Sequence, residues 1–528
     1  MRKTDAFRRA AALMAALSIT VSLAAPAFAG TYYIDNGDIT VTKNADGSQT
    51  VEQNGTSNND SDEIIITTTG AAIGTLESDL EGPAAEDSGF GPVVEDNYQP
   101  AQPEDAEKPE GADQPESAEE AKSADQHESA EQAQPQQAAP AAAPAGATPV
   151  NPKDDGFWGN TITVINNIAD KVLNLTLKDV KIDVSDTGDQ YDWDQKGKAA
   201  LSVQGKGNVE IELDGDNELK SGTQSAGLEK TSTGTLTLKD DSKEAGSLTA
   251  TGGNNAAGIG GGFQGNGENI TITGGTVIAT GGFSAAVGGG LLGSGENIAI
   301  TGGTVNATGT DGAGIGGGNG GVGKNITITG GTVTAAGGFG NAGIGGGNGS
   351  DGENITITGG SVTATGGEFA AGIGGSNGGS GNNITITGGT ATATGGEGGA
   401  GIGGGAEGGG GNNITIKGGT VTATGGGNRG NSGAGIGGGS SGSGENITIN
   451  DGKVTATGGN YAAGIGGGSV GRWGGDAGSG KNITINGGTV NATGDGGAGI
   501  GGGGAAASDI ELWGSNGGNG EDITINGG

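Results

Sequence analysis

The side chains that could do chemistry together in this sequence gather in two short stretches near its C-terminal end. Arg472, Trp473 and Asp476 lie in the first stretch, and Glu511 and Trp513 lie in the second. A tryptophan ring beside carboxylates and a guanidinium group suits stacking on a sugar face, with hydrogen bonds to the sugar hydroxyls. These five residues are the predicted ligand-binding site. The alternative interpretation is that both indoles cap the end of the folded region.

Catalysis and metal binding have little support. The only histidine, His127, lies in an acidic segment, and lysine and arginine are sparse after Gly252 and do not recur at one position. A polysaccharide-cleaving enzyme needs clustered acids and bases, so we predict no catalytic residue. The sequence has no cysteine, which excludes thiolate-based zinc and iron–sulfur sites. Residues 346–351 match the start of a calcium-binding nonapeptide only once, which favours a corner loop, so no metal and no cofactor is predicted.

The first residues predict export. A basic start is followed by an apolar run at 10–25 and by Ala-Phe-Ala, which is typical of a secretory signal peptide over residues 1–29. No later run reaches the roughly 20 apolar residues of a transmembrane helix. We therefore expect a secreted protein at the cell surface. A net charge of −36 argues against nucleic acid as a partner, because that interaction needs lysine and arginine.

Composition divides the remaining chain. Residues 30–70 alternate apolar and polar side chains in short runs and predict a small β-module. Residues 71–156 are rich in Pro, Ala, Glu and Gln, which predicts a disordered acidic linker. All 12 prolines precede Lys153. Their absence from the rest of the chain is expected where every backbone N–H donates to a sheet.

A repeat fills the C-terminal two-thirds. The phrase Asn-Ile-Thr-Ile-Thr-Gly-Gly-Thr-Val-Thr-Ala-Thr-Gly-Gly, followed by Ala-Gly-Ile-Gly-Gly-Gly, is regular over residues 252–528 and degenerate over 157–251. Its first position recurs at spacings that grow from 28 to 40 residues: Asn269, Asn297, Asn325, Asn354, Asn383, Asn413, Asn446, Asn482 and Asp522. Insertions in a repeat protein collect on one edge and often build its binding surface.

The alternation within each repeat predicts strands that stack between repeats. Ile270 and Ile272 share one side while Thr271 and Thr273 share the other. Stacking the repeats about 4.8 Å apart buries columns of Ile, Val and Ala. We therefore predict an all-β, right-handed parallel β-solenoid of about twelve rungs, with the hand taken from the crossover rule for parallel strands.

Three recurring positions allow more than one interpretation. The asparagine column fits an internal ladder of stacked amides, which we favour over glycosylation at its Asn-x-Thr sequons. The outward threonines on two faces resemble the Thr-x-Thr arrays of ice-binding solenoids, although Ala299 and Lys417 interrupt them. A row of aromatic residues is expected to fill a corner; it consists of Phe283, Phe339, Phe369 and Tyr461.

The phrases Asn-Ile-Thr-Ile-Thr-Gly-Gly and Ala-Gly-Ile-Gly-Gly-Gly resemble the glycine-rich repeat regions of exported surface proteins of Gram-positive bacteria. Such proteins are commonly described as carbohydrate-binding-domain-containing or adhesin-like. The resemblance covers about residues 157–528 and implies a cell-surface role and glycan contact, without carrying over any site residue. The sequence stops in the middle of a repeat, as a fragment would.

These observations favour a non-catalytic extracellular repeat protein that acts as an adhesive or glycan-contacting surface element, with a polysaccharide partner. A purely structural stalk for absent domains is the first alternative, and an ice-binding or polysaccharide-cleaving solenoid is the second. The last rung leaves unpaired backbone groups, which predicts end-to-end self-association.

Overall fold

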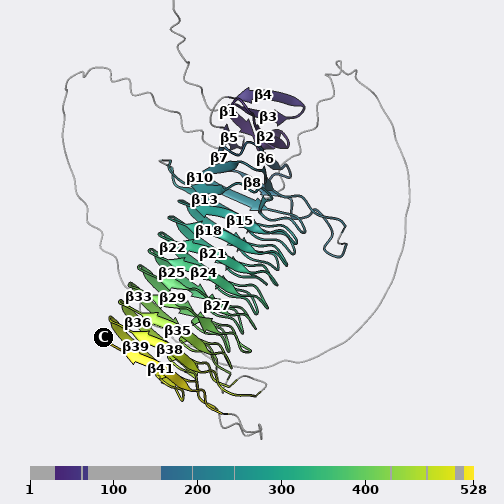
Figure 1. Cartoon of the computed structure of the whole chain (residues 1–528). Helices are drawn as coiled ribbons and strands as arrows, with labels where there is room; N and C mark the ends of the chain where they lie inside the picture. The colour runs from purple at the N-terminus through teal and green to yellow at the C-terminus, as the bar shows by residue number, and fades with distance from the viewer. Residues whose placement is uncertain are drawn as a thin grey trace, which may run out of the picture. The chain divides into compact units, whose positions relative to one another are not determined.

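A computed structural model describes residues 30–60, 64–68, 156–192, 194–242, 244–427, 431–470, 474–505 and 516–527. The predicted signal peptide and nearly all of the acidic linker lie outside these residues. The described part is an all-β parallel solenoid of about eleven turns, close to the twelve expected (Figure 1). It includes one 3-10 helix, η1 (Ile34–Asn36), and contains no helix long and apolar enough to cross a membrane.

Each turn contributes strands to three sheets, which the chain visits in the order A, C, B. Sheet A contains β1 (Gly30–Tyr33), β5 (Ile64–Thr67), β7 (Val172–Lys178), the first half of β10 (Asn208–Lys220), β12 (Leu236–Lys239), β15 (Gly267–Ile272), β18 (Gly295–Ile300), β21 (Gly323–Ile328), β24 (Gly352–Ile357), β27 (Gly381–Asn382), β28 (Thr385–Ile386), β31 (Gly411–Asn412), β32 (Thr415–Ile416), β35 (Gly444–Ile449), β38 (Gly480–Ile485) and β41 (Gly520–Ile525).

Sheet C contains β8 (Lys181–Asp183), the second half of β10, β13 (Gly246–Thr251), β16 (Thr276–Thr280), β19 (Thr304–Thr308), β22 (Thr332–Ala336), β25 (Ser361–Thr365), β29 (Thr390–Thr394), β33 (Thr420–Thr424), β36 (Lys453–Asn460) and β39 (Thr489–Asp495). Sheet B contains β2 (Ile39–Lys43), β3 (Gln49–Gln53), β4 (Thr56–Asp60), β6 (Ile162–Asn166), β9 (Leu201–Gly205), β11 (Leu228–Lys230), β14 (Ile259–Gly260), β17 (Val287–Gly288), β20 (Ile315–Gly316), β23 (Ile344–Gly345), β26 (Ile373–Gly374), β30 (Ile402–Gly403), β34 (Ile436–Gly437), β37 (Ile465–Gly466) and β40 (Ile500–Gly501).

The core is a set of in-register columns. Ile270 pairs with Ile298, which pairs with Ile326 in the next turn, and both side chains of each pair are fully buried. Val277 and Val305 stack in the same way on sheet C. Because apolar residues alternate with threonine along most strands of sheets A and C in the regular turns, one face of these strands is buried and the other faces water. The predicted interior columns are confirmed.

Glycine is required where neighbouring turns touch through their backbones. Gly316 has φ +135°, and a Cβ at this position would lie 2.1 Å from the carbonyl oxygen of Gly345 in the next turn. A Cβ on Gly318 would lie 1.9 Å from the carbonyl oxygen of Gly290 in the preceding turn. The Gly-Gly-Gly runs therefore let sheet B and its connections stack without side chains between them.

An asparagine ladder runs along the outside of sheet A. The Nδ2 of Asn297 donates to Oδ1 of Asn269 at 3.0 Å. This is the first of seven such bonds, which continue in series as far as Asn482. Each member has a positive φ, 57° at Asn269 for example, which asparagine tolerates better than most residues. The predicted amide ladder is confirmed, although most of its members are exposed rather than internal.

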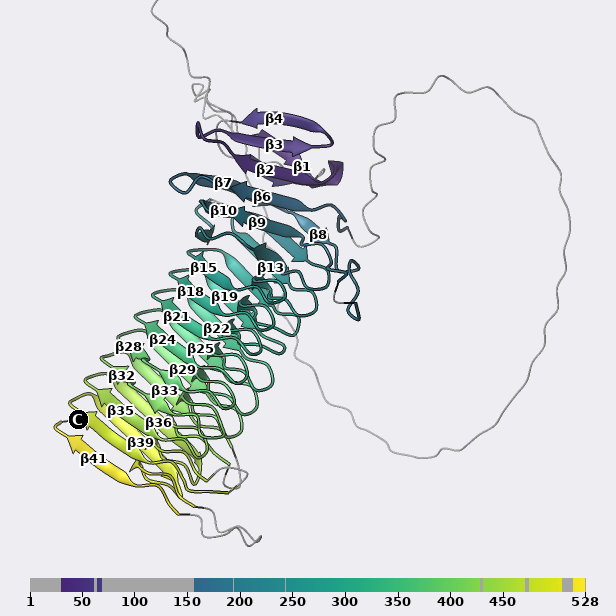
Figure 2. The same cartoon turned by 45° about the vertical axis from the view of Figure 1, so that its right-hand side comes forward.

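The predicted N-terminal module is continuous with the solenoid. Strand β2 pairs in parallel with β6, and β5 pairs in parallel with β7. Ile39 and Ile64 belong to the same buried core as the later turns. Strands β3 and β4 add two antiparallel strands, and the outermost strand, Thr-Ser-Asn-Asn-Asp, is polar (Figure 2). A short polar edge strand discourages pairing with other chains, so this module caps the N-terminal end of the solenoid.

The residues that flank the acidic segment lie close together. Thr68 donates its Oγ1 hydrogen to the carbonyl oxygen of Asp179 at 3.5 Å, and the backbone N–H of Trp158 donates to the carbonyl oxygen of Lys181 at 3.0 Å. The acidic segment therefore leaves and rejoins the same part of the solenoid. The sequence suggests a spacer between two bodies, whereas the described residues on its two sides form one body.

Candidate functional site

The connections on either side of sheet B form one edge of the solenoid, which we call the loop edge. Most sheet B strands in the regular turns have only two residues, so the connection from sheet C and the connection to sheet A lie next to each other. Backbone hydrogen bonds join the two connections. The N–H of Leu291 donates to the carbonyl oxygen of Asn255 at 3.1 Å, and the N–H of Ala406 donates to the carbonyl oxygen of Phe369 at 2.8 Å. The insertion of residues 185–199 and the longer connections after β37 and β40 all begin in one of these connections.

Exposed apolar side chains follow the loop edge. Phe283 is 52% exposed, Leu292 is 58% exposed and Phe339 is 57% exposed. The rings of Phe339 and Phe369 meet edge to face at 5.6 Å. Phe283 and Phe369 have positive φ angles of 57° and 72°, and a positive φ recurs at the same turn position in other repeats, for example at Gly340 and Gly398. The sequence favoured a corner-filling role, which is wrong for Phe283 and Phe339 because more than half of each side chain faces water.

A pocket opens at the N-terminal end of the loop edge. Its volume is about 600 Å³, and it lies between the insertion of residues 185–199 and the following two turns. The polar and aromatic groups that line it are Asp186, Asp189, Gln190, Tyr191, Thr223 and Asn254. Tyr191 is 85% exposed, the most exposed large apolar side chain of the described residues.

Hydrogen bonds fix the insertion that forms this pocket. The backbone N–H of Tyr191 donates to Oδ1 of Asp189 at 2.9 Å, which makes an Asx turn beneath the ring. The N–H of Gly197 donates to the carbonyl oxygen of Thr223 at 2.8 Å. The Nδ2 of Asn254 donates to Oε1 of Gln190 at 2.8 Å and joins the insertion to the third turn. The ring is thus held on a braced loop.

The groups that line the pocket are of the kinds that contact sugars, and acidic groups outnumber basic ones among them. An exposed aromatic ring can cover a sugar face, and nearby carboxylates and amides can bond its hydroxyl groups. Its one cation, Lys220, forms an ion pair with Glu218 at 3.0 Å and lies 3.9 Å from the centre of the Phe157 ring. Lys220 is already paired, and the carboxylates of the pocket outnumber it. The pocket therefore suits neutral or amino sugars better than acidic ones.

Only one of the five predicted site residues lies within the described part of the chain. Asp476 accepts two hydrogen bonds from Asn516, one from the backbone N–H and one from Nδ2, both at 3.0 Å. This pair joins the two longest insertions, as neighbouring turns require. The other four predicted residues lie outside the described residues: Arg472, Trp473, Glu511 and Trp513. Sequence reasoning missed the Tyr191 pocket, although the same criterion of an insertion rich in aromatic and acidic residues would have found it.

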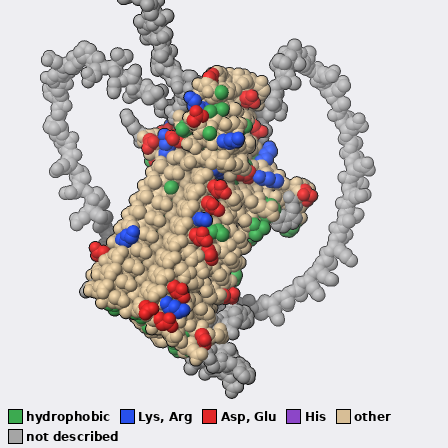
Figure 3. Space-filling model, in the orientation of Figure 1, with side chains coloured by type: hydrophobic (Ala, Val, Ile, Leu, Met, Phe, Trp, Pro, Cys, Tyr) green, Lys and Arg blue, Asp and Glu red, His purple; other side chains and the backbone are tan. Residues whose placement is uncertain are grey.

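Charged side chains form a mixed row at the start of the sheet A strands. Glu296, Lys324 and Glu353 occupy successive turns, and Lys324 lies 3.6 Å from Glu353. Lys481 and Glu445 repeat the arrangement at 3.5 Å. Figure 3 shows this row of acidic and basic groups beside a broad uncharged surface. The described residues contain no group of three or more acidic or histidine side chains placed to hold a metal.

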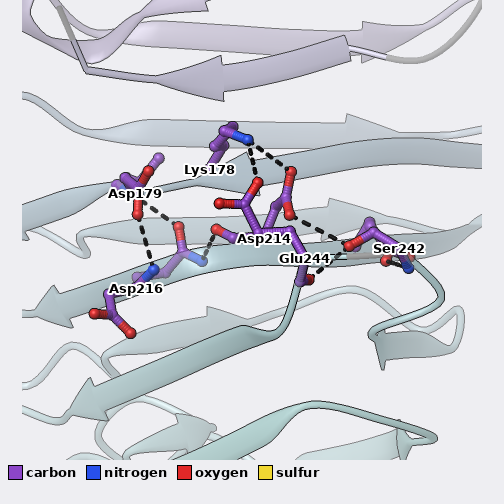
Figure 4. A network of polar contacts seen from close by, with 9 residues as sticks. Lys178, Asp179, Asp214, Asp216, Ser242 and Glu244 are labelled. Atoms are coloured by element: carbon purple, nitrogen blue, oxygen red, sulfur yellow. Dashed lines mark hydrogen bonds and ion pairs between the residues drawn. The ribbon is translucent and has the colours of Figure 1, made fainter. Parts of the chain in front are cut away.

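A second charged cluster lies at the corner between sheets A and C in the first turns. Lys178, whose side chain is 9% exposed, lies 3.2 Å from Asp214 and 2.7 Å from Glu244 (Figure 4). The hydrogen bond that Lys178 donates to Glu244, opposed by partial burial, raises the pKa of Lys178. Asp179 accepts a hydrogen bond from the backbone N–H of Asp216 at 3.0 Å. These charged groups pair with one another, which indicates that the cluster stabilises the corner between sheets A and C.

The fold is that of a parallel β-helix, and the comparisons with known proteins agree. The model of the beta helix repeat family matches eight segments: residues 244–263, 270–291, 298–319, 326–348, 355–379, 414–440, 447–469 and 483–504. These segments follow the solenoid turns, so residues 244–504 are a β-helix repeat region. None of the curated proteins or solved structures compared with the chain matches it.

Proposed function

We propose that this protein is a non-catalytic, secreted surface element that binds neutral or amino-sugar polysaccharides along its loop edge. The observation that carries the proposal is the braced, 85% exposed Tyr191 ring above a pocket of carboxylates and amides. The exposed phenylalanines farther along the same edge would extend the contact, because aromatic rings cover sugar faces at little entropic cost. An extended glycan lying parallel to the solenoid axis would meet several turns at once.

The charge of the protein supports this choice of ligand. With a net charge of −36, the chain repels acidic glycans at long range. The predicted residues Trp473 and Trp513 belong to insertions that begin in the same connections, after β37 and β40. The stalk alternative requires none of these features.

The test is binding of the full chain to insoluble chitin, cellulose, bacterial cell wall and host mucin, measured by pull-down and by intrinsic fluorescence. Tyr191→Ala and Phe339→Ala should each weaken binding several-fold, since stacking contacts are worth about 1 kcal/mol. Ile278→Ala is the matched control, because Ile278 is 40% exposed but lies on the outer face of sheet C. The stalk alternative would be supported if the folded chain bound none of the four materials.

End-to-end self-association remains a proposal of the same kind. Strand β41 pairs with β38, and Ile525 is 63% exposed. A second copy could cover these groups by extending the ladders. Sedimentation velocity over a range of concentrations tests the idea, and a monomer at every concentration would refute it.

A further inference from the structure

The outer face of sheet C carries a two-dimensional grid of threonines. Each strand points its first, third and fifth side chains outward, and the strands are in register. In β22, β25, β29 and β33, eleven of these twelve positions are hydroxyl-bearing: Thr332, Thr334, Ser361, Thr363, Thr365, Thr390, Thr392, Thr394, Thr420, Thr422 and Thr424, with Ala336 as the exception. We call these four strands' outer surface the hydroxyl grid.

The hydroxyl grid is uncharged in a protein with a net charge of −36. Sheet A does not offer the same surface, because its outer side carries the charged row, the asparagine ladder and the interruptions at Ala299 and Lys417. The sequence predicted outward threonines on two faces, and the interruptions at Ala299 and Lys417 both lie on the face of sheet A. The in-register stacking of sheet C shows a wider and more regular array.

The grid has a fixed repeat in both directions. Its spacing is about 4.8 Å between strands and about 6.6 Å between alternate residues along a strand. Threonine is branched at Cβ, so identical stacked side chains are limited to few rotamers and their hydroxyls and methyls lie in rows. Oxygen atoms in hexagonal ice repeat at a distance close to the spacing between strands. A preorganised surface loses little entropy when ordered water binds to it.

We propose that the hydroxyl grid binds ice crystals. Each hydroxyl donates and accepts a hydrogen bond within an ordered water layer, and the methyl groups between them limit the other positions that water can take. The absence of charge matters because a charged group would hold its own hydration shell. This activity is independent of the loop edge, which lies on the connections around sheet B.

The experiment measures how much full chain enters a slowly growing ice hemisphere, and the size of ice crystals in an annealed frozen sucrose solution. Wild-type protein should be enriched in ice over a non-binding reference and keep the crystals small. Thr363→Tyr, at the centre of the grid, should lower the enrichment at least several-fold. Thr356→Tyr, on the outer side of sheet A in the same turn, is the matched control and should not.

Circular dichroism and melting curves would establish that both variants fold. Wild-type protein that is no more enriched in ice than the reference would overturn the proposal. Equal losses in the two variants would also overturn it, because the grid would then have no special role. A concentration-dependent dimer that Thr363→Tyr abolishes, without ice enrichment, would instead assign the face to a second copy of the chain.

Discussion

The first turns of the solenoid and the later turns reach the same geometry with different side chains. Residues 157–251 fill the core with leucines such as Leu175 and Leu213, and hold the corner between sheets A and C with ion pairs. Residues 252–505 use Ile, Val and Ala in the core and Gly-Gly at that corner. The alignment of each turn on the next therefore has two sources. Specific side-chain contacts fix it in the first region, and repeated backbone contacts fix it in the second.

The difference bears on where a binding pocket can form. In the first region the insertion of residues 185–199 is braced by side chains, for example by the 2.8 Å ion pair between Lys196 and Glu229. In the regular turns the neighbouring backbones are in direct contact, and a single Cβ finds no room at many glycines. Function in the regular turns is thus confined to outward side chains and to the loop edge.

The largest expected effect is at a glycine of the regular turns. Gly318→Ala should destabilise the protein by more than about 4 kcal/mol, because its Cβ would lie 1.9 Å from the carbonyl oxygen of Gly290. Gly349→Asn is the control, since no atom lies within 4 Å of a Cβ there and asparagine tolerates a φ of +77°. Urea unfolding followed by circular dichroism measures both. Equal stability of the two variants would contradict the backbone-contact account.

Core truncations should separate the two regions. Leu213→Ala should cost about 2–5 kcal/mol, since the fully buried side chain leaves a cavity. Val362→Ala should cost only about 1–2 kcal/mol because fewer methyl groups are lost and its partner in the next turn is already Ala391. Urea midpoints give both values. A larger loss at Val362 would show that the regular turns depend on tighter packing than their composition indicates.

A pH dependence should arise from Lys230 in the first region. Burial lowers the pKa of this lysine from 10.5 to about 8, and its Nζ donates to the carbonyl oxygen of Ser232 at 2.7 Å. Between pH 8 and 10.5 the unfolded chain holds a proton that the folded chain has lost, so stability should rise with pH across this window. Lys230→Met should remove this rise. Melting temperatures at pH 7 to 10 provide the test, and a parallel rise in the variant would refute the assignment to Lys230.

The smallest effect is expected in the asparagine ladder. Asn383→Gly removes one donor and one acceptor from an exposed row, and should cost about 1 kcal/mol. Asn383→Ala should cost about 1 kcal/mol more, because its φ of 58° suits glycine but not alanine. The unfolding free energies of the two variants separate the contribution of the ladder hydrogen bonds from the cost of a positive φ at alanine. Equal values would mean that the positive φ is not retained.

The sequence by itself determined the solenoid, because a period of about 28 residues with internal alternation allows the apolar columns to be buried in only one way. It also placed the amide ladder and the edge on which insertions collect. Because the turns are nearly identical, the pattern of one repeat predicts these features for all of them.

Only the tertiary structure decided how unlike segments meet. It joined residues 30–67 to the turn at 156–183 across the acidic segment, and it placed Asn254 against Gln190 to complete the Tyr191 pocket. It also exposed Phe283 and Phe339 and aligned the sheet C threonines into one grid. These outcomes depend on long-range pairing between segments without a shared repeat, and on which side of a strand faces water after the chain turns a corner. A local pattern does not encode either.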